Sequence, residues 1–169
     1  TTTLRSSRSR YTFPAGESHI LFNIGQGLTT ESGGYARIVS DSEIEGFKIM
    51  GDFCYGVPQS VIPVYFVVRT NKPAESVRYW KRQPDFSQSA IKDWSSTSGR
   101  YKIYDRFKQP IAGDDIGVAF DYSTTDGEVI EVSVGVSYVS IENARENLDR
   151  EQRGKNFDAI YADAVAAWN

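Results

Sequence analysis

Apolar and polar residues alternate along much of the first 138 residues, which is the pattern of β-strands with one buried face. In segment 43–50, for example, Ile44 and Glu45 fall on opposite faces. The first thirteen residues are rich in Thr and aromatic residues and also have strand composition. Further strands are predicted at 19–23, 35–40, 43–50, 61–70, 76–80, 101–107, 115–121 and 129–138. Many short strands joined by turns indicate a mainly β fold, an antiparallel β-sandwich rather than a parallel α/β sheet.

Turn residues separate these strands. The clearest turn signals are Gly33-Gly34, Asn71-Lys72-Pro73 and Asp126-Gly127. Asp126-Gly127 predicts a β-hairpin, because an Asp-Gly pair between two alternating segments favours a tight two-residue turn. The polar segment 83–100 around Trp94 predicts a long loop, and a loop of that length inside a compact domain is either mobile or functional.

The pattern becomes helical after Tyr138. Ser140 predicts a helix start ahead of residues 141–148, and Gly154 predicts a break. Beyond the break one apolar stripe recurs at three- and four-residue spacing: Phe157, Ile160, Tyr161, Ala164, Val165 and Trp168. Asn169 is a weak helix stop and the stripe needs a partner. We therefore expect a piece of a longer protein, with a β-sandwich at 1–138 and a helical linker at 139–169.

Composition agrees with one globular domain and a helical tail. The 169 residues are 40% apolar and 13% aromatic, and 14 glycines suit a turn-rich β fold. A net charge of −3 argues against a surface that follows nucleic-acid phosphates, although Arg5, Arg8 and Arg10 form a small basic cluster. No apolar run of the sequence approaches the roughly 18 residues of a membrane span. Cys54 is the single cysteine, which excludes an intrachain disulfide.

The residues give little support to nucleophilic or zinc chemistry. A Ser-His-Asp triad needs a base, and we expect the one histidine, His19, to be a strand-edge residue that sequence adjacency alone does not link to Ser18. One Cys and one His do not make a zinc site. Carboxylates can act in glycoside hydrolysis or bind calcium, but structural roles explain the carboxylates of this sequence more simply. They gather in three clusters: Asp41, Glu43 and Glu45; Asp114 and Asp115; Asp121, Asp126 and Glu128.

Aromatic residues are the stronger candidates for ligand contact, because the C–H faces of sugars stack on Trp and Tyr. Trp80 lies at a strand end and Trp94 lies in the polar loop, and ordinary packing is the alternative for both. Phe53, Cys54 and Tyr55 lie between Gly51 and Gly56, and glycines that flank an aromatic residue allow close approach of the backbone to a ligand.

Three segments resemble one family. The first is Arg10-Tyr11-Thr12-Phe13-Pro14, and the second runs from Val136 through Ser137-Tyr138-Val139-Ser140 to Asn147-Leu148, with Glu151 beyond. The third is the helix from Phe157-Asp158-Ala159 to Ala167-Trp168-Asn169. In this order they resemble family 92 of the glycoside hydrolases, calcium-dependent exo-acting α-mannosidases with which bacteria trim host and fungal glycans.

The resemblance implies a two-domain enzyme. It predicts an N-terminal β-sandwich of the galactose mutarotase-like (super-sandwich) kind, a helical linker, and a C-terminal (α/α)₆ barrel outside this chain. In that family the general acid, the general base and most of the calcium shell come from the barrel, so no catalytic or metal residue is expected here. The reaction is inverting, which calls for carboxyl groups roughly 6.5–9.5 Å apart.

The resemblance also suggests where this chain touches substrate. Gly51-Asp52-Phe53-Cys54 resembles a Gly-Phe-Cys-Gly loop near the mannose pocket, so Phe53, Cys54 and Tyr55 are the predicted substrate-binding residues, although Asp52 and Tyr55 interrupt the pattern. Ser9 stands where the family usually has His. The expected partners are mannose-containing glycans and the catalytic barrel, and the expected location is the periplasm or the cell exterior. The alternative is a stand-alone carbohydrate-binding or structural β-sandwich module.

Overall fold

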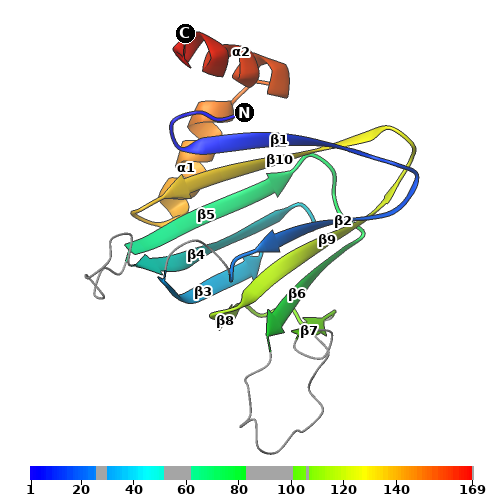
Figure 1. Cartoon of the computed structure of the whole chain (residues 1–169), viewed down its shortest axis with the longest axis vertical. Coiled ribbons are helices and arrows are strands. Elements are labelled where there is room, and N and C mark those ends of the chain that lie inside the picture. Colours follow the sequence, from blue (N-terminus) through cyan, green and yellow to red (C-terminus); the bar gives the residue numbers. More distant parts are fainter. Residues whose placement is uncertain (26–29, 52–61, 83–100, 106, 169) are drawn as a thin grey trace, which may run out of the picture.

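The computed structural model describes residues 1–25, 30–51, 62–82, 101–105 and 107–168. Within these residues the chain forms two packed β-sheets followed by two helices (Figure 1). The strands are β1 (Ser6–Phe13), β2 (Gly16–Asn23), β3 (Thr30–Ile38), β4 (Glu43–Gly51), β5 (Ile62–Thr70), β6 (Ser76–Arg82), β7 (Tyr101–Tyr104), β8 (Ile111–Gly113), β9 (Ile116–Thr124) and β10 (Glu128–Ser137). The helices are α1 (Ile141–Gln152) and α2 (Phe157–Trp168).

The larger sheet has the order β1-β10-β5-β4-β3-β8, and the smaller has the order β2-β9-β6-β7. All neighbouring strands in both sheets are antiparallel. The predicted antiparallel β-sandwich is therefore confirmed. Strands that follow one another along the chain often belong to different sheets, so several connections cross from one sheet to the other.

The predicted Asp126-Gly127 hairpin is wrong. These residues do form a tight turn, and Gly127 has a φ of 75° that favours glycine. However, β9 pairs with β2 and β6 in the smaller sheet, whereas β10 pairs with β1 and β5 in the larger sheet. The turn thus carries the chain between sheets, alongside the β1–β2 connection, where the Gly127 N–H donates to the Phe13 carbonyl at 3.0 Å. Figure 1 shows both connections at the same corner of the sandwich.

Two further expectations change in the larger sheet. Gly33-Gly34 is not a turn between strands but lies inside β3, where the register against β4 shifts between Glu31 and Gly34. Gly33 takes a φ of 80° at this bulge. Strand β8 was not predicted, because its three residues are too few to show alternation.

The core lies between the two sheets. Fully buried side chains come from both of them and include Ile44, Tyr79, Val118, Phe120 and Ile130. Each apolar side chain of this size contributes about 1.5–3 kcal/mol by leaving water. Alternation assigned the faces correctly: Ile44 is in the core, whereas Glu45 points away from it and binds arginines on the outside of the sheet.

Helix α1 covers the outer face of the larger sheet (Figure 1). Ser140 is its N-cap, as predicted, and its side chain accepts a hydrogen bond of 3.1 Å from the Asn143 N–H. Ala144 and Leu148 pack over Val67 and against Gly135 of β10. A Cβ at position 135 would lie 2.4 Å from the Ala144 carbonyl oxygen, so the helix approaches this closely because residue 135 is glycine.

Helix α2 leaves most of its apolar stripe uncovered. Gly154, with a φ of 68°, breaks the two helices apart as predicted. Ile160 is buried, and the Arg10 guanidinium lies 4.3 Å from the centre of the Phe157 ring. Tyr161, Val165 and Trp168 are exposed, with Trp168 at 88% of its full area. The described part of the sandwich therefore does not bury the stripe. Neither helix in the described residues is long and apolar enough to cross a bilayer.

Candidate functional site

The substrate-binding residues predicted from the sequence, Phe53, Cys54 and Tyr55, lie outside the described residues, and so does Trp94. The strands that carry the segment 52–61 are described. Strand β4 ends at Gly51, β5 begins at Ile62, and Met50 pairs with Ile62. The ends of β4 and β5 therefore fix the two points at which the segment with the predicted substrate-binding residues joins the sandwich.

Several strand ends meet at the same end of the sandwich. Lys48 of β4 donates to the main-chain carbonyls of Gly25 at 3.1 Å and Asp114 at 3.3 Å, which link the end of β2 with the start of β9. The Asp114 carboxylate accepts the Gly33 N–H at 2.8 Å. The Lys48 contacts join the two sheets near the end of β4, the strand from which the predicted substrate segment continues.

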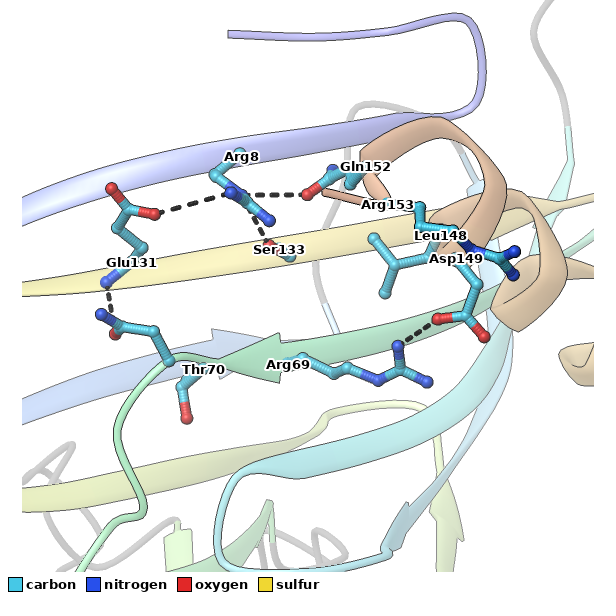
Figure 2. A pocket seen from close by; sticks show the side chains of 10 residues that line it. Arg8, Arg69, Thr70, Glu131, Ser133, Leu148, Asp149, Gln152 and Arg153 are labelled. Carbon is cyan, nitrogen blue, oxygen red and sulfur yellow. Dashed lines mark hydrogen bonds and ion pairs between the residues drawn. The ribbon is translucent and has the colours of Figure 1, made fainter. Parts of the chain in front are cut away.

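A groove of about 520 Å³ lies between the C-terminal half of α1 and the outer face of strands β1, β10 and β5 (Figure 2). Figure 2 shows Arg8 from β1 and Arg69 from β5 reaching toward the helix residues Gln152 and Asp149. Arg8 donates through Nε to Gln152 Oε1 at 3.0 Å and to Ser133 Oγ at 3.1 Å. Arg69 forms an ion pair with Asp149. Arg8 and Arg69 are thus both bound to residues of α1, and this arrangement suits attachment of the helix to the sheet.

A series of ion pairs between α1 and the larger sheet continues from this groove, and we name it the charge ladder. Arg145 of the helix binds both Glu43 and Glu45 of β4, and Arg37 and Arg69 bind the same two carboxylates from the neighbouring strands. Glu45 is 4% exposed. Removing one partner of such a buried pair is strongly destabilising, because the remaining charge is left in a medium of low dielectric constant. The cluster of Glu43 and Glu45 therefore holds α1 on the sheet and offers no unpaired carboxylate for acid–base chemistry.

A second charged cluster lies on the outer face of the smaller sheet. Asp121 of β9 accepts hydrogen bonds from Arg78 Nε at 2.6 Å, Arg78 Nη2 at 2.8 Å and His19 Nδ1 at 2.7 Å. Partial burial disfavours the charged form of Asp121, but the hydrogen bonds from Arg78 and His19 outweigh it and lower the pKa of the carboxyl group. Asp121 is therefore an ionised carboxylate held in a fixed position.

This charged cluster borders a shallow depression of about 400 Å³. Its apolar part is formed by Leu21, Trp80, Ile103 and Ala119. Trp80 was a candidate for ligand contact in the sequence, and the structure brings it together with His19 and Asp121. The sequence argument missed Arg78 and Leu21. Their signal was present in the alternation of β2 and β6, but choosing them needed the strand order of the smaller sheet.

The described residues do not assemble a triad or a calcium shell. His19 lies on edge strand β2 as expected, and its partner is Asp121, whereas the side chain of Ser18 lies in the interior and bonds Thr124 Oγ1 at 2.8 Å. Among the described residues no group of three or more His, Cys, Asp or Glu side chains could hold a metal ion. The third carboxylate cluster is also divided, because Glu128 binds Lys72 and the Thr125 N–H, away from Asp121.

Known proteins with this fold include mannosidases. The α-mannosidase BT3965 of family 92 from Bacteroides thetaiotaomicron matches with a TM-score of 0.76 and 23% identity, covering 99% of this chain and 20% of that protein. The family 92 glycosyl hydrolase ccman5 matches with a TM-score of 0.76 and 22% identity, covering 99% of this chain and 19% of that protein. The inverting mannosidase BT2199 from Bacteroides thetaiotaomicron VPI-5482 matches with a TM-score of 0.71 and 16% identity, covering 97% and 19%.

These identities show a shared fold, and the chain spans about a fifth of the length of those proteins. No curated protein matches the chain. The sequence model described as the glycosyl hydrolase family 92 N-terminal domain matches residues 1–137, which are the β-sandwich up to the end of β10. On that match, the chain belongs to glycosyl hydrolase family 92 and contains its N-terminal domain.

Proposed function

We propose that this chain is the non-catalytic N-terminal domain of a calcium-dependent, inverting exo-α-mannosidase that hydrolyses terminal α-mannosyl linkages of glycans. The observation that carries the proposal is the match of residues 1–137 to the family's N-terminal domain. The mannosidases with the same fold support it, because their chains are about five times as long as this one. The catalytic acid and base then belong to a further domain, an (α/α)₆ barrel that α1 and α2 connect to the sandwich.

In this proposal the sandwich forms one wall of the mannose site. Phe53, Cys54 and Tyr55 contact the sugar from a segment carried by β4 and β5. Lys48 supports that wall, since its ammonium group joins β4 to the main-chain carbonyls of Gly25, after β2, and Asp114, before β9. A wall tied to two sheets keeps its position while the substrate binds, which is what precise orientation of the sugar requires.

Calcium in this proposal is bound by the catalytic domain. The described residues of the sandwich do not fit a calcium shell, because their closely spaced carboxylates, such as Glu43 and Glu45, are bound by arginines. The metal would orient the mannose hydroxyls when bound. Inversion additionally needs space for a water between the sugar and the base, with the two carboxyl groups roughly 6.5–9.5 Å apart.

The proposal also covers location. An enzyme that trims host or fungal glycans meets them outside the bacterial cytoplasm, so we assign the protein to the periplasm or the cell exterior of a bacterium. Fractionation of the source cells checks this, and recovery of the protein solely from the cytoplasm would contradict it.

The test uses a longer protein that carries this chain together with the family's catalytic domain. It should release mannose from α-linked mannosides, and proton NMR of the first product should show the β-anomer, because inversion starts from an α-linkage. A chelator should abolish the activity and added Ca²⁺ should restore it. The 169-residue chain alone is the matched control and should be inactive. Inactivity of the longer protein on every α-mannoside tried would count decisively against the proposal.

A further inference from the structure

The depression on the smaller sheet owes its shape to small residues on the central strand β9. Gly117, Ala119 and Asp121 face outward there, because Val118 and Phe120 between them are buried in the core. Ala119 is paired with Leu21 of β2 on one side and with Arg78 of β6 on the other. Neighbouring strands lie about 4.8 Å apart, so the flanking side chains stand about 10 Å apart across this floor. The result is a trough about one sugar ring wide.

Trp80 forms one wall of the trough and is held there by Gly117. A Cβ at position 117 would lie 2.2 Å from both Cε2 and Cζ2 of Trp80, so the indole ring occupies the space that a side chain would need. Leu21 is 67% exposed and Ile103 is 47% exposed. The described part of the chain therefore places a half-buried aromatic ring and two exposed aliphatic side chains around one small floor.

The other end of the trough is polar and fixed. Both oxygens of Asp121 are held by Arg78, and His19 holds one of them from the opposite side. A carboxylate and a guanidinium in fixed positions provide an acceptor and donors for hydroxyl groups without further ordering of the side chains. His19 is half exposed, so its ring borders the solvent side of this cluster.

The apolar part and the polar part of the trough match the two kinds of surface that a sugar presents. A pyranose has a C–H face that stacks on an aromatic ring and an edge of hydroxyl groups that needs charged or polar partners. An entirely apolar ligand would leave the polar end without partners, and an anion would meet the Asp121 carboxylate. We propose that Trp80, Leu21, Ala119, Arg78, Asp121 and His19 form a pyranose-binding site on the outer face of the smaller sheet.

This site is separate from the mannose wall of the proposed function. That wall attaches at the strand ends beside Gly51, whereas the trough lies on the face of β2, β9 and β6. The site would hold a glycan chain on the protein while another sugar occupies the catalytic centre. The choice of mannose as the first probe rests on the proposed function, but the site itself rests on the geometry of the trough.

The test is a titration of the 169-residue chain, labelled with ¹⁵N, with the methyl α-pyranosides of mannose, glucose and galactose. We expect saturable chemical-shift changes at the amides of 119 and 121 and at the Trp80 indole N–H, with a dissociation constant in the millimolar range. Trp80→Ala should weaken binding at least tenfold, and Trp80→Phe, which keeps an aromatic ring, should weaken it less. Tyr161→Ala is the matched control, since Tyr161 is an exposed aromatic residue on α2, outside the trough.

Each variant's spectrum first has to show the dispersion of the folded chain. Absence of shifts with all three sugars at 100 mM, or shifts confined to residues outside the trough, would overturn the inference. Equal weakening by Tyr161→Ala would overturn it as well. The titration needs no catalytic domain, so a longer protein that fails to hydrolyse mannosides would contradict the proposed function and leave the binding result intact.

Discussion

Asp121 shows how one residue combines structural and chemical roles. Its carboxylate joins β2 to β6 across β9 through His19 and Arg78. Because its pKa in the folded protein lies below the ordinary 3.8, its ionisation stabilises the fold at neutral pH, and this contribution is lost as the pH falls through the lowered value. We expect Asp121→Asn to lower the free energy of unfolding by about 1–2 kcal/mol at pH 7.

The pH dependence separates this effect from a general loss of packing. The difference between Asp121→Asn and the original chain should shrink as the pH falls below the ordinary pKa of 3.8, because the unfolded original chain then binds a proton before the folded chain, whose carboxyl pKa is lowered, does so. Urea denaturation at pH 7 and at pH 2.5 measures it. Glu17→Gln on the neighbouring strand β2 is the matched control, because Glu17 is exposed and should show little change at either pH. A difference of the same size at both pH values would rule out ionisation as the source.

Helix α1 depends on the charge ladder as well as on its apolar face. Arg145→Ala would leave the buried Glu45 with Arg37 and remove a partner of Glu43. Each carboxylate keeps one arginine, so we expect a loss of about 1.5–3 kcal/mol in the free energy of unfolding, the usual effect of removing a hydrogen bond to a charged group. The matched control is Arg150→Ala, since Arg150 pairs with Glu146 at an exposed i,i+4 position that contributes about 0.3–0.5 kcal/mol.

Hydrogen exchange locates the effect of Arg145→Ala on this element. Amides of α1 should exchange faster in the variant, while the central strands β9 and β6 of the smaller sheet change less, because the helix lies on the outer face of the larger sheet. Equal stability of Arg145→Ala and Arg150→Ala would show that the ion pairs of Arg145 contribute no more to stability than an exposed pair.

The sequence predicted the positions of strands and helices better than it predicted which strands pair with one another. Alternation identified most strands, and Ser140 ahead of a helical pattern identified the start of α1, because these signals are local. Asp126-Gly127 misled because a turn between sheets and a hairpin turn have the same residues, and the difference lies in which strands β9 and β10 join. The trough of Trp80 required the order of three strands that are distant in the sequence. The predicted contacts at Phe53, Cys54 and Tyr55 stay a prediction.

At the scale of the whole molecule, helix α2 presents an apolar surface that the described residues do not cover. Tyr161, Val165 and Trp168 stay exposed although the core between the sheets is complete. If a catalytic domain covers this stripe, as the proposed function requires, Trp168→Ala should change the unfolding free energy of the 169-residue chain by less than about 0.5 kcal/mol. In the longer protein the same substitution should cost about 3 kcal/mol, the usual effect of removing a buried aromatic side chain. Ile160→Ala is the comparison, since Ile160 is buried within this chain and should be destabilising in both proteins. Denaturation of the four variant proteins decides the matter: an effect of Trp168→Ala that is small in both would mean that the stripe faces solvent in the longer protein too.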